Sequence, residues 1–384
     1  MVRVYKYLYY VLFLLALLWV LPELYHLAFP NKRTVPFTQY SEVAQKFLYA
    51  KRDSVTGKFK HYDRAGRTYS ERDFDSLLPS LYVRQLHAAN RLPQTVQGVP
   101  VTKEALERNG FIFKAAPQKI NVPAPPLYFL LESMPKRVDL EMPNDVFRAN
   151  SAGVQFILMD SNSVVRPKTA RFQKALAQKK VAFPLQRLAN NPTTHKPYDS
   201  GCLVLDNNGN LFQLKQNAGQ PFVRPIPLPQ GVTPAYLFVT EFPSRKYLGF
   251  MTDTGGNLYA ITLPGYEVVR TGLPAVNLAE ESLTIFGNMF YWTAVIGRSD
   301  RTDIWALDAN TLQAVDNMCY LAPKKKGWDS YLFPFQLSFT STKHKFFRPQ
   351  VQAFSWVGAV LWIGVIALFL GFRYRQCKYR SANK

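Results

Sequence analysis

A short pattern recurs along the middle of this chain and limits the folds that the chain can adopt. An apolar strand, an aspartate, a small polar turn and a second strand occur in FILMDSNSVV, CLVLDNNGNLFQLK and GFMTDTGGNLYAIT, where the aspartates are Asp160, Asp206 and Asp253. One further period leads to Asp300 in FYWTAVIGRSDRTDIWALD. A period of about 47 residues is typical of β-propeller blades and related repeat architectures. We therefore expect a series of similar β-sheets.

The turns of this repeat favour hairpins over calcium loops. Asn208-Gly209 and Gly255-Gly256 supply residues that accept positive φ, as tight hairpin turns require. An EF-hand loop needs its glycine at the sixth position, whereas DNNGNL has glycine at the fourth. Further strands are expected in PFVRPIPL, PAYLFVTEF, YEVVRTGL and SLTIFGN. The prediction is a mainly β fold with a β-propeller-like repeat domain of about four to six blades over residues 136–349, to which RVDLEMPNDVFRA adds a closing strand or part of a blade.

Residues 30–135 have a different character and predict a small mixed α/β part. DSVTGKFKHYDRAGRTYS has the turn residues of a hairpin at 55–57 and 64–66. A helix is expected to begin at Ser70, with Pro79 as a kink or break.

A basic helical insertion is expected inside the repeat domain, in RPKTARFQKALAQKK. Phe172, Leu176 and Val181 would face inward. The basic side chains would face solvent or an anionic surface; they are Arg171, Lys174, Lys179 and Lys180.

The C-terminal part of the chain contains a membrane-spanning pattern. Residues 351–372 are 22 residues without a charge, enough to cross a hydrocarbon core of roughly 30 Å. Trp356 suits the headgroup layer, and Ala367 and Gly371 form a small-xxx-small pair on which another helix could pack. Residues 373–384 carry five basic residues and no acid, which predicts a cytoplasmic tail.

The N-terminal part resembles this pattern. Arg3 and Lys6 lie in a short tail, residues 1–6, that precedes a predicted anchor at residues 7–29, with Glu23 at the outer interface. A cleaved signal peptide is the alternative, but no small-x-small cleavage site follows the apolar run, so an uncleaved anchor is favoured. With both ends cytoplasmic, the chain is predicted to lie in the cytoplasmic (inner) membrane of a bacterial envelope, with its main domain extracytoplasmic, in the periplasm.

The net charge of +21 takes its meaning from this topology. With 47% apolar and 14% aromatic residues, the chain can bury enough surface to fold, which excludes a disordered protein. About +15 of the charge remains on the outer part once both ends are subtracted. Few nucleic acids lie outside the cytoplasmic membrane, so the basic excess points to an anionic surface, an anionic ligand or an acidic partner.

Few residues point to chemistry. Asp139, Glu141 and Asp145 form an acidic cluster, and strand alternation would place Asp139 and Glu141 on one face for acid–base work or for a cation, although a solvent-facing strand edge is the favoured interpretation. The histidines are too scattered for a local metal motif; they are His26, His61, His87, His195 and His344. Whether Cys202 and Cys319 pair is left open. No catalytic, cofactor-binding or metal-binding residue is assigned, and no cofactor is expected.

Four segments resemble a known family. VDLEMPNDVFR, NPTTHKPYDSG, LVLDNNGNLFQLKQNAGQPFVRP and NMFYWTAV are similar to segments of a bacterial family of two-anchor membrane proteins, domain of unknown function 4857. The resemblance implies no activity and brings no catalytic residues with it. It does support an N-terminal anchor over a cleaved signal.

Three functions follow as competing hypotheses. The first is a non-enzymatic binding or accessory subunit of an envelope or transport complex, with another membrane protein as partner. The second is a sensor or binding module for an anionic ligand, suggested by the outer charge. The third is an envelope enzyme whose site is assembled from Asp139, Glu141 or His195.

Overall fold

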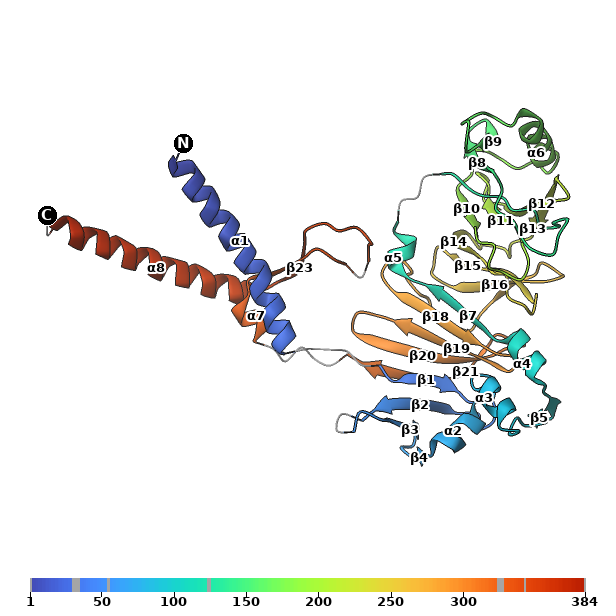
Figure 1. Cartoon of the computed structure of the whole chain (residues 1–384), viewed down its shortest axis with the longest axis horizontal. Coiled ribbons are helices and arrows are strands. Elements are labelled where there is room, and N and C mark those ends of the chain that lie inside the picture. The colour runs from blue at the N-terminus through green and yellow to red at the C-terminus, as the bar shows by residue number, and fades with distance from the viewer. Residues whose placement is uncertain are drawn as a thin grey trace. The chain divides into compact units, whose positions relative to one another are not determined.

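The computed structural model describes residues 2–29, 35–53, 56–122, 126–322, 328–341 and 343–382. The chain divides into two compact units. The sheet unit comprises residues 35–116 and 123–320, and the terminal unit comprises residues 1–34, 117–122 and 321–384 (Figure 1). Each unit is described by itself.

The sheet unit is mainly β, and three of its sheets are four-stranded antiparallel meanders. The first holds β1 (Phe37–Tyr40), β2 (Phe47–Arg52), β3 (Phe59–Asp63) and β4 (Thr68–Tyr69). The second holds β10 (Arg187–Asn190), β11 (Cys202–Leu205), β12 (Leu211–Asn217) and β13 (Gln220–Ile226). The third holds β14 (Pro234–Val239), β15 (Tyr247–Asp253), β16 (Leu258–Thr262) and β17 (Val268–Arg270). The expected series of similar sheets is thus confirmed.

The fourth sheet is completed by a strand from far away in the sequence. Its meander is β18 (Ser282–Gly287), β19 (Tyr291–Gly297), β20 (Arg301–Asp308) and β21 (Ala314–Leu321). β7 (Phe111–Ala115) adds to the free edge of β18, with Ala115 opposite Leu283 and Phe111 opposite Gly287. The alternating burial of β7 points Phe111, Phe113 and Ala115 inward. Sequence analysis did not predict this pairing.

The predicted aspartate turns hold in two sheets with the same hydrogen bonds. In the β11–β12 turn, Asp206 Oδ1 accepts from the Asn210 amide at 2.8 Å; in the β15–β16 turn, Asp253 Oδ1 accepts from the Asn257 amide at 2.8 Å. Asp300 also lies between the second and third strands of its sheet, as the period predicts, but its side chain is exposed and pairs with Arg301. The turn geometry is therefore shared by Asp206 and Asp253, and Asp300 shares only their place in the sheet.

The hairpin predicted at Asp160 is only partly formed: the Leu158 amide donates to the Ser163 carbonyl and the Val165 amide donates to the Phe156 carbonyl, both at 2.9 Å. After β9 (Gly153–Leu158) the chain makes a single bridge, between Ile157 and Val164, and then enters α6 (Arg166–Gln178). Pro167 in the first turn of α6 suits a helix start, where the missing N–H would have no partner. The segment after Asp160 therefore continues as a helix.

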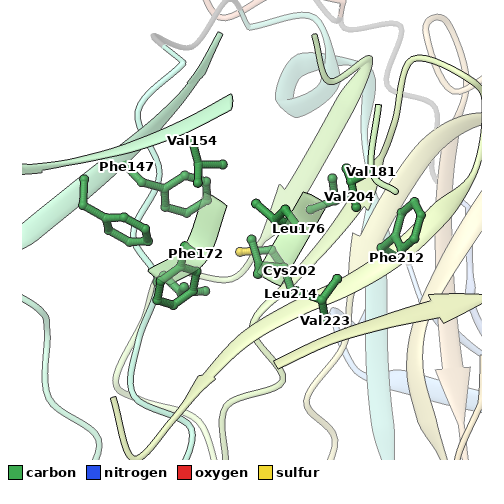
Figure 2. Packing of buried hydrophobic residues seen from close by; sticks show 12 residues of the cluster. Phe147, Val154, Phe172, Leu176, Val181, Cys202, Val204, Phe212, Leu214 and Val223 are labelled. Carbon is green, nitrogen blue, oxygen red and sulfur yellow. The ribbon is translucent and has the colours of Figure 1, made fainter. Parts of the chain in front are cut away.

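The predicted helices are confirmed. The helix expected after Ser70 is interrupted as proposed, into α2 (Glu71–Leu77) and α3 (Val83–Ala88), and Ser70 Oγ accepts from the Asp73 amide at 3.1 Å. The basic insertion is α6, which packs on β13 and on β9, whose hairpin partner is β8 (Asp145–Asn150). Figure 2 shows its inward residues Phe172 and Leu176 among the apolar side chains of β8, β9 and β11 to β13.

Aromatic side chains fill the region where the third and fourth sheets meet. The Phe111 ring lies 4.4 Å from Phe242 and 5.3 Å from Trp292, between ring centroids. Phe113 lies 4.8 Å from Phe250. Residues that are far apart in the unit's sequence thus share one core.

The remaining small elements of the unit are β5 (Thr95–Val96), β6 (Val99–Pro100) and α4 (Lys103–Asn109).

The terminal unit holds two long helices, α1 (Val2–Ala28) and α8 (Trp356–Ala382), where the apolar segments were identified. Residues 351–354, which were expected to be helical, belong instead to β23 (Gln350–Phe354), which pairs with β22 (Phe335–Ser338). In the described part of the chain, no helix is both long enough and apolar enough to cross a membrane. The membrane-spanning role of α1 and α8 is not confirmed and stays a prediction. The unit also holds α5 (Pro117–Ile120) and α7 (Asp329–Leu332).

Candidate functional site

The acidic pair singled out in the sequence does not lie on a strand. Asp139 and Glu141 are exposed and belong to an irregular segment that ends where β8 begins. Pro135 and Pro143 flank this segment, and a proline donates no hydrogen bond to a neighbouring strand. The prediction of a shared strand face is therefore wrong.

The other candidate residues make contacts of their own. His195 is exposed, and its backbone amide donates to Thr193 Oγ1 at 3.1 Å. Asp145 is buried and accepts from Lys168 Nζ at 2.9 and 2.8 Å. Across the described residues, no group of histidine, cysteine and acidic side chains could hold a metal ion. Cys202 and Cys319 are both free thiols, the first buried and the second exposed.

A buried charge cluster lies instead in the loop that joins β10 to β11, within NPTTHKPYDSG. Lys196 Nζ donates to Asp199 Oδ1 and to Glu241 Oε1, both at 2.7 Å. The three side chains are 4%, 2% and 1% exposed, respectively. Glu241 comes from the turn between β14 and β15, so the ion pairs join the second sheet to the third.

Neutral groups complete the contacts of both carboxylates. Ser133 Oγ and the Gly201 amide donate to Asp199 Oδ2 at 2.6 and 2.9 Å. Asn191 Nδ2 donates to Glu241 Oε2 at 2.7 Å, and the Ser200 amide donates to Oε1 at 2.8 Å. Lys196 Nζ makes its third bond to the Asn191 carbonyl at 2.9 Å. All three protons of this ammonium group are used, and every carboxylate oxygen has a donor.

Burial governs the electrostatics of the cluster. It raises the pKa of the Glu241 carboxyl, against the hydrogen bonds from Lys196, Ser200 and Asn191 that lower it. It also raises the pKa of Tyr198 to about 12, with the Glu241 charge acting in the same direction and Arg245 against it. The Arg245 guanidinium lies 4.5 Å from the centre of the Tyr198 ring. The hydrogen bonds of Glu241 are filled, as expected of an internal structural contact and not of a site that exchanges protons with a substrate. The Tyr198 hydroxyl, by contrast, is buried without a hydrogen-bond partner among the described residues.

Sequence reasoning missed this cluster for two reasons. Lys196 and Asp199 had a local signal, because their charges stand between Pro192 and Gly201 in a loop bounded by apolar strands. Glu241 had none, since its partners lie more than forty residues earlier in the sequence.

A polar cleft of about 570 Å³ lies beside the Asp253 turn. It is lined by Tyr236, Thr252, Asp253, Asn277, Glu281 and Arg298, among others. Arg298 is engaged by Glu281 at 2.6 Å and by Asp303 at 2.8 Å. Arg298 and Glu281 at this cleft are thus paired within the protein, and Asp253 accepts hydrogen bonds from Asn257 and Tyr259.

The sheets and the charge cluster fall within one family model, the domain of unknown function DUF4857, which matches residues 37–307. The chain belongs to this family. The match begins with β1 and ends in β20, so the family covers most of the sheet unit, including β7 and the loop of Lys196. The resemblance of the four sequence segments is thereby confirmed as a family match, whereas the two-anchor membrane character attached to it is not.

Solved structures with some likeness to this chain include the following three proteins. The Dos1 propeller is 10% identical, with a TM-score of 0.26, over 46% of this chain and 45% of that chain. PorZ, a bacterial surface component of the type-IX secretion system of Porphyromonas gingivalis, is 12% identical, with a TM-score of 0.23, over 76% of this chain and 33% of that chain. TolB from Acinetobacter baumannii is 10% identical, with a TM-score of 0.23, over 76% of this chain and 81% of that chain. This chain therefore spans less than half the length of the first two, and at these TM-scores the description of the fold rests on the sheets themselves. Among curated proteins, none matches.

Proposed function

We propose that this DUF4857 protein is a non-enzymatic binding or accessory subunit of a bacterial envelope or transport complex. The observation that carries the proposal is that the charged side chains of the candidate sites are either buried with internal partners or exposed with no bond between them. The cluster of Lys196, Asp199 and Glu241 is buried and saturated with internal hydrogen bonds, so it holds two sheets together and leaves no group free for a substrate. Asp139, Glu141 and His195, from which an enzyme site would have been built, are exposed and joined by no hydrogen bond or ion pair among the described residues.

Propeller-like repeats suit such a role. Stacked four-stranded sheets of this size present loops and edges to a partner without needing a reactive centre. We propose that the four meanders and the β8–β9 hairpin are the blades of a propeller-like domain, and that another membrane protein is the partner.

The proposed location is the cytoplasmic membrane, with the sheet unit in the periplasm. The uncharged run at 351–372, the basic tail after it and the apolar segment after Lys6 support this location. Ala367 and Gly371 would then offer a helix surface for a second membrane protein.

Two measurements test the proposal. Reporter fusions at both ends and within the sheet unit should give cytoplasmic, cytoplasmic and periplasmic signals, and the full chain should sediment with membranes after a carbonate wash. A soluble chain after that wash contradicts the location.

Co-purification in a mild detergent tests the partner. One partner should recur in stoichiometric yield, and Ala367→Leu with Gly371→Leu should reduce that yield, whereas Ala359→Leu on the same helix serves as a matched control. A chain that runs as a lone monomer in every preparation contradicts the accessory role.

The second candidate function, a binding module for an anionic ligand, is favoured by the basic residues of α6. Arg171, Lys174, Lys179 and Lys180 are all exposed, and α6 contains no acidic residue. A thermal-shift screen with anionic sugars should then show stabilisation that salt weakens.

A further inference from the structure

The end of α6 borders a cleft of about 550 Å³ that differs from the polar cleft near Asp253 in having no acidic residue in its lining. Its lining includes Lys179, Lys180, Leu211, Phe212, Ile226 and Leu228. The cleft lies within the sheet unit, between the end of α6 and the strands β12 and β13.

The two kinds of lining residue are chemically distinct. Leu228 and Val232 are half-buried and Pro227 is exposed, and these three residues form an apolar floor. Leu211, Phe212 and Ile226 are buried in the cores on either side, and Figure 2 shows Phe212 close to Val181, just past the end of α6. Lys179 and Lys180 are exposed, and neither forms an ion pair with any described residue. An apolar surface with unneutralised cations at its rim complements a molecule with an apolar body and a negative head.

The Asp206 carboxylate, whose turn supplies Gly209 and Asn210 to the lining, forms no ion pair with either lysine, and its hydrogen bonds are filled by other groups. Asp206 is fully buried; its Oδ1 accepts from the amides of Asn208 and Asn210 at 2.9 and 2.8 Å. Its Oδ2 accepts from the Ala182 amide at 3.1 Å and from Asn210 Nδ2 at 3.2 Å. The positive charge at the rim is therefore available to a ligand.

The backbone at Lys180 supplies an independent observation. The Lys180 amide donates to the Ala177 carbonyl at 2.9 Å and the Val181 amide donates to the Leu176 carbonyl at 3.1 Å, which is the Schellman arrangement of a helix end. The residue at that position adopts positive φ and is usually glycine, whereas here Lys180 has φ of 57°. A lysine thus occupies a position where glycine would fit without strain, although Lys180 is one of nine described non-glycine residues with positive φ. A binding role is one reason for a side chain to be kept at such a position.

We propose that this cleft binds an anionic amphiphile, with the negative head group at Lys179 and Lys180 and the alkyl body on the apolar floor. Its volume lies within the range of about 300 to 1,000 Å³ that is usual for small-molecule sites. A free alkyl phosphate or fatty acid and an anionic lipid within a bilayer share this chemistry. The site does not depend on the proposed accessory role.

Decyl phosphate is the probe for the first test, with the full chain held in a neutral detergent at low salt. It should raise the unfolding midpoint in a saturable way, whereas decanol and inorganic phosphate, which each supply half of the ligand, should bind at least about ten-fold more weakly. Decyl phosphate binding no better than decanol overturns the proposal.

Charge variants locate the site. Lys179→Gln and Lys180→Gln should each weaken decyl phosphate by about five- to ten-fold, and Lys174→Gln, which removes an exposed cation of α6 outside the cleft lining, should leave affinity unchanged. An equal loss in Lys174→Gln means that only the general charge of the helix acts, which overturns the site.

Lys180→Gly tests whether Lys180 contributes to ligand binding or only to the structure of the helix end. Relief of the positive φ should raise the unfolding midpoint of the free protein while affinity falls, a pair of effects that a purely structural lysine would not produce. Ala218→Gly is the matched control, since Ala218 also has positive φ, 46°, and does not line the cleft; it should stabilise without changing affinity. Unchanged affinity in Lys180→Gly overturns the proposal.

Vesicles distinguish the two sources of the ligand. If phosphatidylglycerol vesicles bind in a Lys180-dependent way and displace free decyl phosphate, a lipid within a bilayer is a source of the ligand. If decyl phosphate binds and the vesicles do not, the source is a free amphiphile. Both results support the site, whereas Lys180-independent binding of both probes overturns it.

Discussion

Lys196 is nearly as removed from water as the phenylalanines of the core, yet its ammonium group has three oxygen partners. Such an arrangement is stable because the desolvation of each charge is offset by its partners. The same balance makes the cluster sensitive, because loss of one member leaves the others charged and buried.

Replacement of Lys196 by methionine should lower the free energy of unfolding by about 3–5 kcal/mol, the usual result of breaking a buried ion pair from one side. Urea unfolding at pH 7 measures it. Lys174→Met is the control, an exposed lysine of α6 that should change the free energy by less than about 0.5 kcal/mol.

The loss of unfolding free energy in Lys196→Met should become smaller as the pH falls from 7 to 5. Burial already raises the pKa of Glu241, and loss of the lysine removes a group that lowers it. A carboxyl whose pKa is raised in the folded state destabilises the fold when ionised, so protonation relieves the variant. A deficit that stays constant across this pH range would contradict the role of Glu241.

Asp63 shows the opposite pH dependence. The hydrogen bond from Lys46, at 2.7 Å, lowers the pKa of Asp63 to about 2, and Tyr69 and the Arg67 amide act in the same direction against burial. Because this pKa lies below that of the unfolded chain, the contribution is fully present above about pH 4 and is lost as the pH falls toward 2. Asp63→Asn should therefore reduce stability at pH 6 by up to about 2 kcal/mol and flatten the acid side of the stability profile. If the unfolding free energy of Asp63→Asn varied with pH in parallel with that of the unchanged protein, the role of Asp63 would be refuted.

At the scale of elements, one five-residue turn recurs in three places. Asp63, Asp206 and Asp253 each begin it, a glycine follows at the fourth position, and the amide of the fifth residue donates to the aspartate Oδ1. The amide of each aspartate donates in turn to the carbonyl of the fifth residue. The turn is set by its own sequence, which is why the repeat could be predicted.

Two glycines near the second sheet differ in what a methyl group would meet. Gly201 has φ of 72°, and a Cβ there would overlap the Leu214 carbonyl and Lys215. Gly209 has φ of 82°, with nothing within 4 Å of the added atom. Gly201→Ala should cost at least about 3 kcal/mol and Gly209→Ala about 1 kcal/mol, the second from backbone strain alone. Equal losses in denaturant unfolding would show that contact at Gly201 plays no part.

The sequence predicted elements whose cause is local and failed where the cause is distant. The turns, the split helix at Pro79 and the inward face of α6 all follow from neighbouring residues. The hairpin after Asp160 is cut short because a helix start competes for the same segment. Glu241 and the partner of β7 had no local signal, since loop closure over such distances is decided by packing of the whole unit.

At the scale of the whole molecule, β7 links the first third of the chain to the fourth sheet by pairing with β18. Phe111 packs on Phe242 from the third sheet and on Trp292 from the fourth. This strand therefore joins three stretches of sequence in one core, and its side chains should matter to all of them.

Phe111→Ala should lower the free energy of unfolding by about 3–5 kcal/mol, as expected of a buried aromatic residue. Ile112→Ala on the same strand is the control, because Ile112 is 56% exposed and should cost less than about 1 kcal/mol. Both variants should still unfold in one transition. Separate transitions for early and late segments would contradict a shared core.

The pairing of β7 with β18 also means that β7 is synthesised well before the strand with which it pairs. Ala115 leaves the ribosome about 170 residues before its partner Leu283, which at roughly 5–20 residues per second is a delay on the order of 10 to 30 s. Throughout that interval a strand with three inward apolar residues has no native neighbour, and such an edge readily pairs with the wrong chain. The nascent protein should therefore depend on a chaperone to reach its native state.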